Sequence, residues 1–198
     1  IAHPSSQIHN LFPGINLIPF VEGKDLLDLL PKDCDVVHLH VFYKDPDRIG
    51  KPYLVTEHGN RGPEADLAVN TVFVSESHAR LHGRLCFVRN GVPVQDYHYS
   101  EAKDRYLLFL GRMEWPHKNA RTAMDLSVDL NVPLKMSGKY PPWVRPKLWG
   151  AWCLHPFAVS RNVERLGYID GERKLNLLAR APFLFHAVNW HEPGAIAV

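Results

Sequence analysis

The first half of the chain alternates short apolar segments with segments of helical pattern. Several of the apolar segments are continuous runs, which is typical of strands buried on both faces in a parallel sheet. Helices are predicted at Gly23–Leu30 and Ser75–Gly83, and the second begins with a serine that can cap it and ends at a glycine. The predicted strands are Ile15–Phe20, Asp35–Val41, Tyr53–Glu57, Thr71–Ser75 and Arg84–Val88.

The same alternation returns in the second half. The segment Asn90–Arg105 between the two sets is polar, rich in turn residues and without period, so we interpret it as a linker. The sequence therefore predicts an α/β fold of two parallel-sheet domains, residues 1–98 and 99–198. The second domain has predicted strands at Tyr106–Gly111, Val132–Ser137, Val163–Tyr168 and Pro182–Ala187, and predicted helices at Asn119–Leu130 and Gly171–Ala181.

Composition adds that the chain is an ordinary globular one. Of its 198 residues, 45% are hydrophobic and 22% charged, which is enough apolar material for a core. The 23 basic and 21 acidic residues leave a net charge of +2, so no basic surface for nucleic acid is expected. No apolar run approaches the roughly 20 residues of a membrane span, and the N-terminus lacks the pattern of a signal peptide. These features predict a cytoplasmic protein.

Cysteines and tryptophans suggest packing rather than chemistry. Cys34, Cys86 and Cys153 are odd in number and far apart, so we expect free buried thiols in a reducing compartment. All five tryptophans lie in the second half, and we favour a packing role for them. A sugar-stacking platform or a peripheral membrane contact is the alternative. The tryptophans are Trp115, Trp143, Trp149, Trp152 and Trp190.

Two cations follow the first predicted strand of the second domain. In "FLGRMEWPHKNARTAM", the strand ends at Gly111, and Arg112 and Lys118 flank a short loop that leads into a helix. Ligands of open α/β sheets bind beyond the carboxyl ends of the strands, and two fixed cations there suit a diphosphate. A pair of solvated surface cations is the alternative interpretation.

A carboxylate follows the last predicted strand. In "NWHEPGAIAV", Glu192 and Pro193 stand where a helix would begin, with Ile196 and Val198 on its first inward turn. The free N–H groups of such a helix start attract anions, and a carboxylate beside them can accept hydrogen bonds from sugar hydroxyls. Alternatively, Glu192 only complements the helix dipole.

Taken in order, these motifs resemble one family. The strand ending in "GR", the lysine six positions on, the "LGY" strand and "W-x-EPG" resemble the C-terminal domain of GT-B glycosyltransferases, specifically the large retaining family four (glycosyl transferases group 1). The segments "DVVHLH", "YLVTEHG", "TVFVSES" and "FVRNGVP" resemble its N-terminal domain in the same order. The resemblance implies two Rossmann-like parallel-sheet domains that face a cleft.

The resemblance also implies that both domains are incomplete. The second glutamate of the family motif would fall at position 200, beyond the last residue, and the first strand and glycine-bearing loop of the N-terminal domain are absent. We therefore expect an interior fragment that is inactive alone. Gly194 and Ala195 stand where the family usually has phenylalanine and glycine, which alters the expected sugar pocket.

Site residues of the second domain follow from the resemblance. It implies that Arg112 and Lys118 bind the donor diphosphate and stabilise the charge of the leaving nucleotide. It implies that Glu192 holds hydroxyl groups of the donor sugar and that the amides of Gly194 and Ala195 face the diphosphate. The nucleotide base would lie by Gly167, Tyr168 and Ile169.

In the first domain, His58 of "TEHG" matches the family histidine that reaches the transferred sugar. Without the resemblance, a strand-end histidine with a local hydrogen bond would be the better interpretation. His38 and His40 share one face of a strand, but no third ligand stands at usable spacing, so we reject a metal site. The resemblance likewise implies no metal and no cofactor.

The predicted function is transfer of a hexose from a nucleoside-diphosphate sugar with retention of configuration. The acceptor would be a sugar, a lipid-linked molecule or a small molecule. A nucleotide-sugar epimerase of the same fold is one alternative, and a non-catalytic relative that binds nucleotide sugars is another. The altered "EPGA" keeps the second alternative open.

Overall fold

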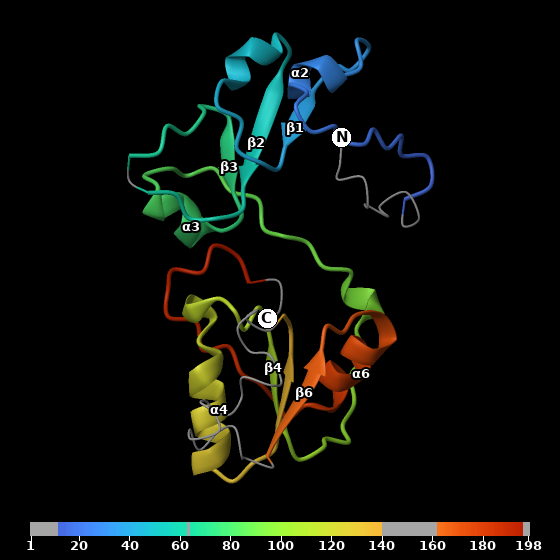
Figure 1. Cartoon of the computed structure of the whole chain (residues 1–198), viewed down its shortest axis with the longest axis vertical. Helices are drawn as coiled ribbons and strands as arrows, with labels where there is room; N and C mark the ends of the chain where they lie inside the picture. The colour runs from blue at the N-terminus through green and yellow to red at the C-terminus, as the bar shows by residue number, and fades with distance from the viewer. Residues whose placement is uncertain (1–11, 63, 140–161, 196–198) are drawn as a thin grey trace. The chain divides into compact units, whose positions relative to one another are not determined.

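The computed structural model describes residues 12–62, 64–139 and 162–195 (Figure 1). The chain consists of two compact units, unit 1 at Ile1–Val88 and unit 2 at Arg89–Val198. The domain boundary predicted from the sequence, between residues 98 and 99, lies ten residues after this division and stays a prediction. Each unit is an α/β structure with its own parallel sheet.

The sheet of unit 1 contains three parallel strands in the order β1-β2-β3. A short segment continues it through a bridge between Phe73 and Phe87, where the Phe73 N–H donates to the Cys86 carbonyl. The strands are short, and their bounds lie within those predicted. They are β1 at Val37–Leu39, β2 at Tyr53–Glu57 and β3 at Thr71–Phe73.

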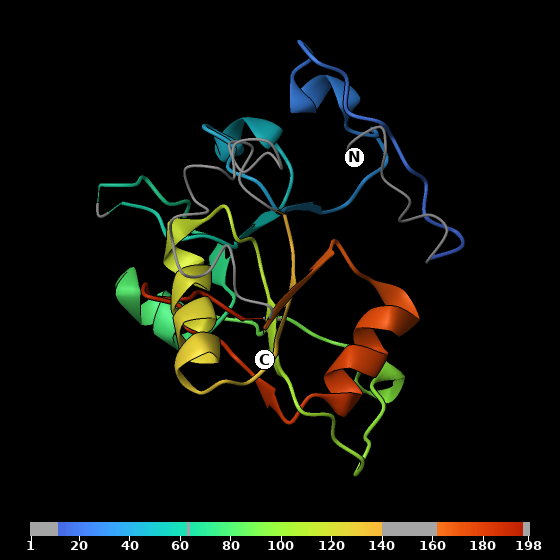
Figure 2. The same cartoon turned by 60° about the horizontal axis from the view of Figure 1, so that its bottom comes forward.

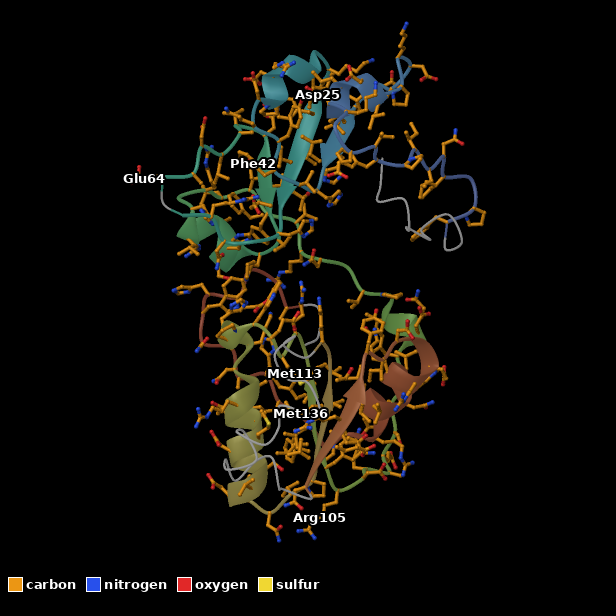
Figure 3. All side chains as sticks on the ribbon, viewed as in Figure 1. Asp25, Phe42, Glu64, Arg105, Met113 and Met136 are labelled. Atoms are coloured by element: carbon orange, nitrogen blue, oxygen red, sulfur yellow. The ribbon has the colours of Figure 1, made fainter. Side chains whose placement is uncertain are left out.

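Helices cover the apolar side of β1 and flank β3. Helix α2 spans Leu26–Leu29, the 3-10 helix η1 spans Pro46–Ile49 and α3 spans Glu76–Leu81. Asp25, labelled in Figure 3, caps α2, and the Tyr43 hydroxyl donates to the same carboxylate at 2.6 Å. Leucines of α2 pack on Val37, Leu39 and Ile49, so this helix forms because its apolar residues complete a core.

Unit 2 contains a four-stranded parallel sheet in the order β6-β5-β4-β7. Strand β4 therefore lies inside the sheet, and all four of its residues are buried or nearly so. The strands are β4 at Leu107–Leu110, β5 at Leu134–Ser137, β6 at Val163–Gly167 and β7 at Phe183–Leu184. The 3-10 helices η2 and η3 span Val94–Asp96 and Pro116–Lys118.

Helices α4 (Ala120–Asp129) and α6 (Gly171–Arg180) lie on opposite faces of this sheet, as Figures 1 and 2 show. Alternate residues of β4 divide between the two faces, as the strand period of two requires. Leu107 and Phe109 belong to the core that includes α4 residues, whereas Leu108 packs with α6 residues. Met113 and Met136, labelled in Figure 3, belong to the α4 side.

Two strand predictions were wrong. Residues Ile15–Phe20 form no strand beyond a single bridge at Pro19, and Ile15 and Phe20 are each 45% exposed. Arg84–Val88 contributes only the single bridge to β3. Its position at the open edge of the sheet also leaves Cys86 exposed, so the expectation that this thiol is buried was wrong. Trp143, Trp149, Trp152 and Cys153 lie outside the described residues.

Within the described residues, no helix is long and apolar enough to cross a membrane.

Candidate functional site

The carboxyl ends of β4, β5 and β6 are held together by backbone contacts. The Gly111 N–H donates to the Ser137 carbonyl at 3.0 Å, and the Gly138 N–H donates to the Gly167 carbonyl at 3.0 Å. Gly138 has φ +143°, and a Cβ there would stand 1.7 Å from the Gly111 oxygen. Only glycine fits, because the backbones after β4 and β5 meet at this point. The loop that carries Arg112 therefore begins at a rigid edge of the sheet.

Arg112 is fixed on two sides. Its Nε donates to Glu114 Oε1 at 2.9 Å, and its guanidinium carbon lies 4.2 Å from the centroid of the Trp115 ring. Glu114 has a side chain only 11% exposed. Burial opposes ionisation of Glu114, but its own backbone N–H and Arg112 outweigh that effect and lower its pKa. The ion pair leaves the terminal NH₂ groups of Arg112 as donors for a ligand.

Lys118 and Glu192 meet although 74 positions separate them in sequence. The Lys118 Nζ donates to Glu192 Oε2 at 2.7 Å, and both side chains are 18% exposed. The Trp190 indole Nε1 donates to the same oxygen at 2.7 Å. The sequence predicted Lys118 and Glu192 as two ligand-binding groups, and the structure brings them together as a partly buried ion pair.

The environment of Glu192 favours its charged form. Burial raises the pKa of this carboxyl, but hydrogen bonds from Lys118 and Trp190, with the nearby charges of Lys118 and His186, reverse the shift and lower it. Glu192 is therefore an anion and a hydrogen-bond acceptor at neutral pH.

Three aromatic side chains connect the two ion pairs. The His117 ring lies between Trp115, at a centroid distance of 5.2 Å, and Trp190, at 4.2 Å. A backbone hydrogen bond joins the same two loops, since the Asn189 N–H donates to the His117 carbonyl at 3.0 Å. The loop after β4 and the loop after β7 thus form one surface.

The other predicted residues of unit 2 lie on neighbouring segments. Gly167 ends β6, Tyr168 is 81% exposed and Ile169 is buried. Gly194 and Ala195 follow Glu192 in a segment that is not helical as far as residue 195. The first turn of the helix predicted there falls on residues 196–198, which lie outside the described part of the chain.

In unit 1, three histidines gather at the carboxyl ends of β1 and β2. The His40 Nδ1 lies 2.9 Å from His58 Nε2, and His38 Nε2 lies 2.7 Å from the Thr56 hydroxyl. All three imidazoles are exposed. Burial, followed by the nearby His38 and His58, lowers the pKa of His40. One nitrogen of the close pair must be unprotonated for the hydrogen bond to form.

A buried polar layer holds the turn that carries His58. Glu57, with a side chain 8% exposed, accepts hydrogen bonds from the Gly59 N–H at 3.1 Å and from Arg61 Nε at 2.8 Å. From α3, the His78 Nε2 approaches the Gly59 carbonyl at 3.1 Å. Both polar groups of Gly59 are therefore satisfied by side chains.

His78 itself is 2% exposed and packs edge-on against the Phe73 ring. Its pKa is lowered, mainly by burial, and the like charge of His82 adds to that effect. The Gly59 carbonyl and the more distant Glu57 act in the opposite direction without reversing it.

In the part of the chain that the structure describes, no three His, Cys, Asp or Glu side chains are arranged to hold a metal ion.

Sequence reasoning missed the residues that hold the predicted ones. Glu114 stands two positions after Arg112, and its acidic side chain beside a cation was a readable signal. Gly138, directly after a predicted strand, was another. By contrast, nothing in the sequence pairs Trp190 with Glu192 or His40 with His58, because these contacts depend on side-chain directions that the fold sets.

Comparisons with known proteins support the fold. No family model matches the chain, and no curated protein matches it. Among solved structures, the chain resembles AviGT4, a glycosyltransferase involved in avilamycin A biosynthesis, with a TM-score of 0.66 and 25% identity over 93% of this chain and 57% of that one. It also resembles sucrose-phosphate synthase from Thermosynechococcus elongatus, with a TM-score of 0.59 and 12% identity over 90% of this chain and 59% of that one.

The chain thus spans less than two thirds of the length of either neighbour. The likeness to the synthase, at 12% identity, concerns the fold alone. The predicted α/β fold and the resemblance to glycosyltransferases of GT-B type are confirmed by these neighbours.

Proposed function

We propose that this protein transfers a hexose from a nucleoside-diphosphate sugar to an acceptor hydroxyl with retention of configuration. The observation that carries the proposal is the ion pair of Lys118 with Glu192, which the Trp190, His117 and Trp115 rings connect to the ion pair of Arg112 with Glu114 at the carboxyl edge of the unit 2 sheet. The two loops thus carry two cations that can bind phosphate and one carboxylate that can accept from hydroxyl groups, and the likeness to a glycosyltransferase supports the same chemistry.

The diphosphate would bind to the remaining donors of the two cations. Arg112 keeps its terminal NH₂ groups after its contact with Glu114, and Lys118 keeps two of its three N–H donors after its contact with Glu192. These groups stabilise the negative charge that grows on the leaving diphosphate, a role that needs no metal. The amides of Gly194 and Ala195 would add further donors.

The sugar and the base would lie on either side of the diphosphate. Glu192 would accept hydrogen bonds from sugar hydroxyls through Oε1, since Oε2 already has two donors. The exposed Tyr168 ring, beside Gly167 and Ile169, would stack on the base. His58 would contact the transferred sugar.

In the reaction, the bond between the anomeric carbon and the diphosphate oxygen breaks. The acceptor oxygen bonds to that carbon on the same face, and its proton passes to the leaving diphosphate. The incoming hydroxyl therefore needs no protein base, and retention follows from attack on the face that the leaving group vacates.

The test uses the protein at its natural length with a panel of nucleoside-diphosphate hexoses and candidate acceptors. We expect a nucleoside diphosphate to bind by calorimetry, the free nucleoside to bind far more weakly, and the product to keep the anomeric configuration of the donor by proton NMR. Inversion would contradict the retaining mechanism. Epimerised donor without acceptor would favour an epimerase, and binding without turnover would favour a non-catalytic relative.

A further inference from the structure

The carboxylate of Glu192 is held asymmetrically. Lys118 Nζ and Trp190 Nε1 both donate to Oε2 at 2.7 Å, while Oε1 accepts no hydrogen bond from any described residue. Two donors that approach one oxygen from different directions fix the rotation of the carboxylate plane. A single ammonium could not do so, because its three donors serve either oxygen equally well.

Trp190 is itself held in place by contacts on its ring. Its ring packs on His117 at a centroid distance of 4.2 Å, and the Lys118 ammonium lies 5.7 Å from its centroid. The neighbouring Asn189 is joined to the His117 carbonyl through its backbone N–H. The indole N–H is thus a rigid donor supplied by the loop after β7 and supported by the loop after β4.

We propose that Trp190 is a positioning residue that turns Glu192 so that Oε1 faces the hydroxyl groups of the donor sugar. This inference rests on the proposed function, because it assigns Glu192 to the sugar half of a nucleoside-diphosphate sugar. Trp190 acts through the carboxylate and needs no contact with the sugar.

The arrangement separates recognition of the sugar from recognition of the diphosphate. Arg112 is oriented by Glu114 and Trp115, on the other side of the His117 ring. Loss of the Trp190 N–H would therefore free the Glu192 carboxylate to rotate while leaving Arg112 in place. Affinity should fall for ligands that carry the sugar and stay constant for the nucleoside diphosphate.

The experiment compares Trp190→Phe with Trp115→Phe in the protein at its natural length. Trp190→Phe keeps a ring against His117 and removes only the donor. We expect about tenfold weaker binding of the nucleoside-diphosphate sugar, the usual effect of one lost hydrogen bond to a charged group, with unchanged affinity for the nucleoside diphosphate. Trp115→Phe, which alters the support of Arg112, should weaken both ligands by equal factors.

Two further readouts separate positioning from general damage. The acid limb of the kcat/KM profile should move to higher pH in Trp190→Phe, because one of the hydrogen bonds that lower the pKa of Glu192 is gone. Without any ligand, the indole N–H resonance of Trp190 should shift upfield in Glu192→Gln, where a neutral acceptor replaces the carboxylate. Thermal unfolding of each variant checks that it is folded.

The outcomes distinguish the two proposals. Failure of the wild-type protein to bind any nucleoside diphosphate would overturn the proposed function and this inference with it. Normal binding by the wild type, together with equal losses for both ligands or no loss in Trp190→Phe, would overturn only the role of Trp190. An indole N–H resonance of Trp190 that does not shift in Glu192→Gln would also overturn the role of Trp190.

Discussion

The carboxyl edge of the unit 2 sheet carries paired full charges, whereas that of the unit 1 sheet carries imidazoles. Lys118 and Glu192 are partly buried and fixed by a 2.7 Å contact. His40 and His58 are exposed and share a hydrogen bond that exists only while one of them is neutral. Unit 2 thus presents a paired cation and anion, while unit 1 presents a hydrogen bond between two imidazoles.

The layers beneath the two edges also differ. In unit 2, glycine backbones meet directly at Gly111 and Gly138, so the edge depends on the absence of side chains. In unit 1, the buried Glu57 and His78 hold Gly59 through hydrogen bonds. The stability of the unit 2 edge should therefore be sensitive to added side-chain volume, and that of the unit 1 edge to protonation.

The largest effect expected is that of Gly138→Ala. The new Cβ would stand 1.7 Å from the Gly111 oxygen, a backbone atom that cannot move without shifting β4, so we expect unit 2 to lose about 3 kcal/mol or more. Gly83→Ala in unit 1 is the matched control. Gly83 has φ +65° but nothing within 4 Å of a Cβ, so only the backbone conformation is strained, at about 1 to 2 kcal/mol.

Urea unfolding of these two variants can be followed separately in each unit. All five tryptophans lie after residue 88, so their fluorescence reports unit 2, and methyl resonances in NMR report unit 1. Equal losses in the two variants would show that the contact at Gly138 is not decisive.

The next effect concerns ligand affinity. Arg112→Ala and Lys118→Ala each remove a charge-assisted contact worth about 1.5 to 3 kcal/mol, so a nucleoside diphosphate should bind roughly ten- to a hundredfold more weakly. Arg112→Lys should recover only part of the loss, because a point charge cannot replace the planar fork. Calorimetry measures the affinity for the nucleoside diphosphate, and the free nucleoside, which carries no phosphate, serves as the control ligand. Unchanged affinity for the diphosphate would show that neither residue binds it.

A smaller effect should follow from pH. The folded-state pKa of His78 lies below its ordinary value of 6.5, so the unfolded chain binds this proton first as pH falls. The stability of unit 1 is then complete above pH 6.5 and decreases below it, by at most about 1.4 kcal/mol per pH unit for one proton.

In unit 2 the shifted carboxyls behave differently. Glu114 and Glu192 have a pKa below their ordinary value of 4.5, so the stability that they contribute is present above that pH and lost only below it. Between pH 7 and 5, the urea midpoint of unit 1 should therefore fall while that of unit 2 stays level. If the urea midpoints of the two units changed by the same amount between pH 7 and 5, the expected difference between the units would be wrong.

The smallest effect is a change in one titration. Because His58 contributes to the lowered pKa of His40, though less than burial does, His58→Asn should raise the pKa of His40. NMR titration of the imidazole protons measures it, and the Thr56→Val variant, which alters the His38 contact instead, serves as comparison. A pKa of His40 that is the same in wild type and His58→Asn would mean that the two rings are not coupled in solution.

Sequence reasoning succeeded where local pattern decides the structure. β2 was predicted with its observed bounds, and α4 differs from its prediction by one residue at each end, because apolar period and capping act within a few positions. Ile15–Phe20 failed since an apolar run becomes a strand only when a neighbouring strand pairs with it. The sequence named both Lys118 and Glu192 but not their pairing, because charges 74 positions apart carry no local signal.

The sheet order of unit 2 has a consequence for folding during synthesis. Strand β4 lies between β5 and β7, and Arg180 at the end of α6 pairs with Asp104 ahead of β4, 76 positions earlier. All described strands of the unit 1 sheet have been synthesised once residue 88 has emerged, but β4 lacks its partner β7 until residue 184 has left the ribosome. We therefore expect unit 1 to fold on the nascent chain while the exposed edge of β4 depends on chaperones, since closing so long a loop is slow.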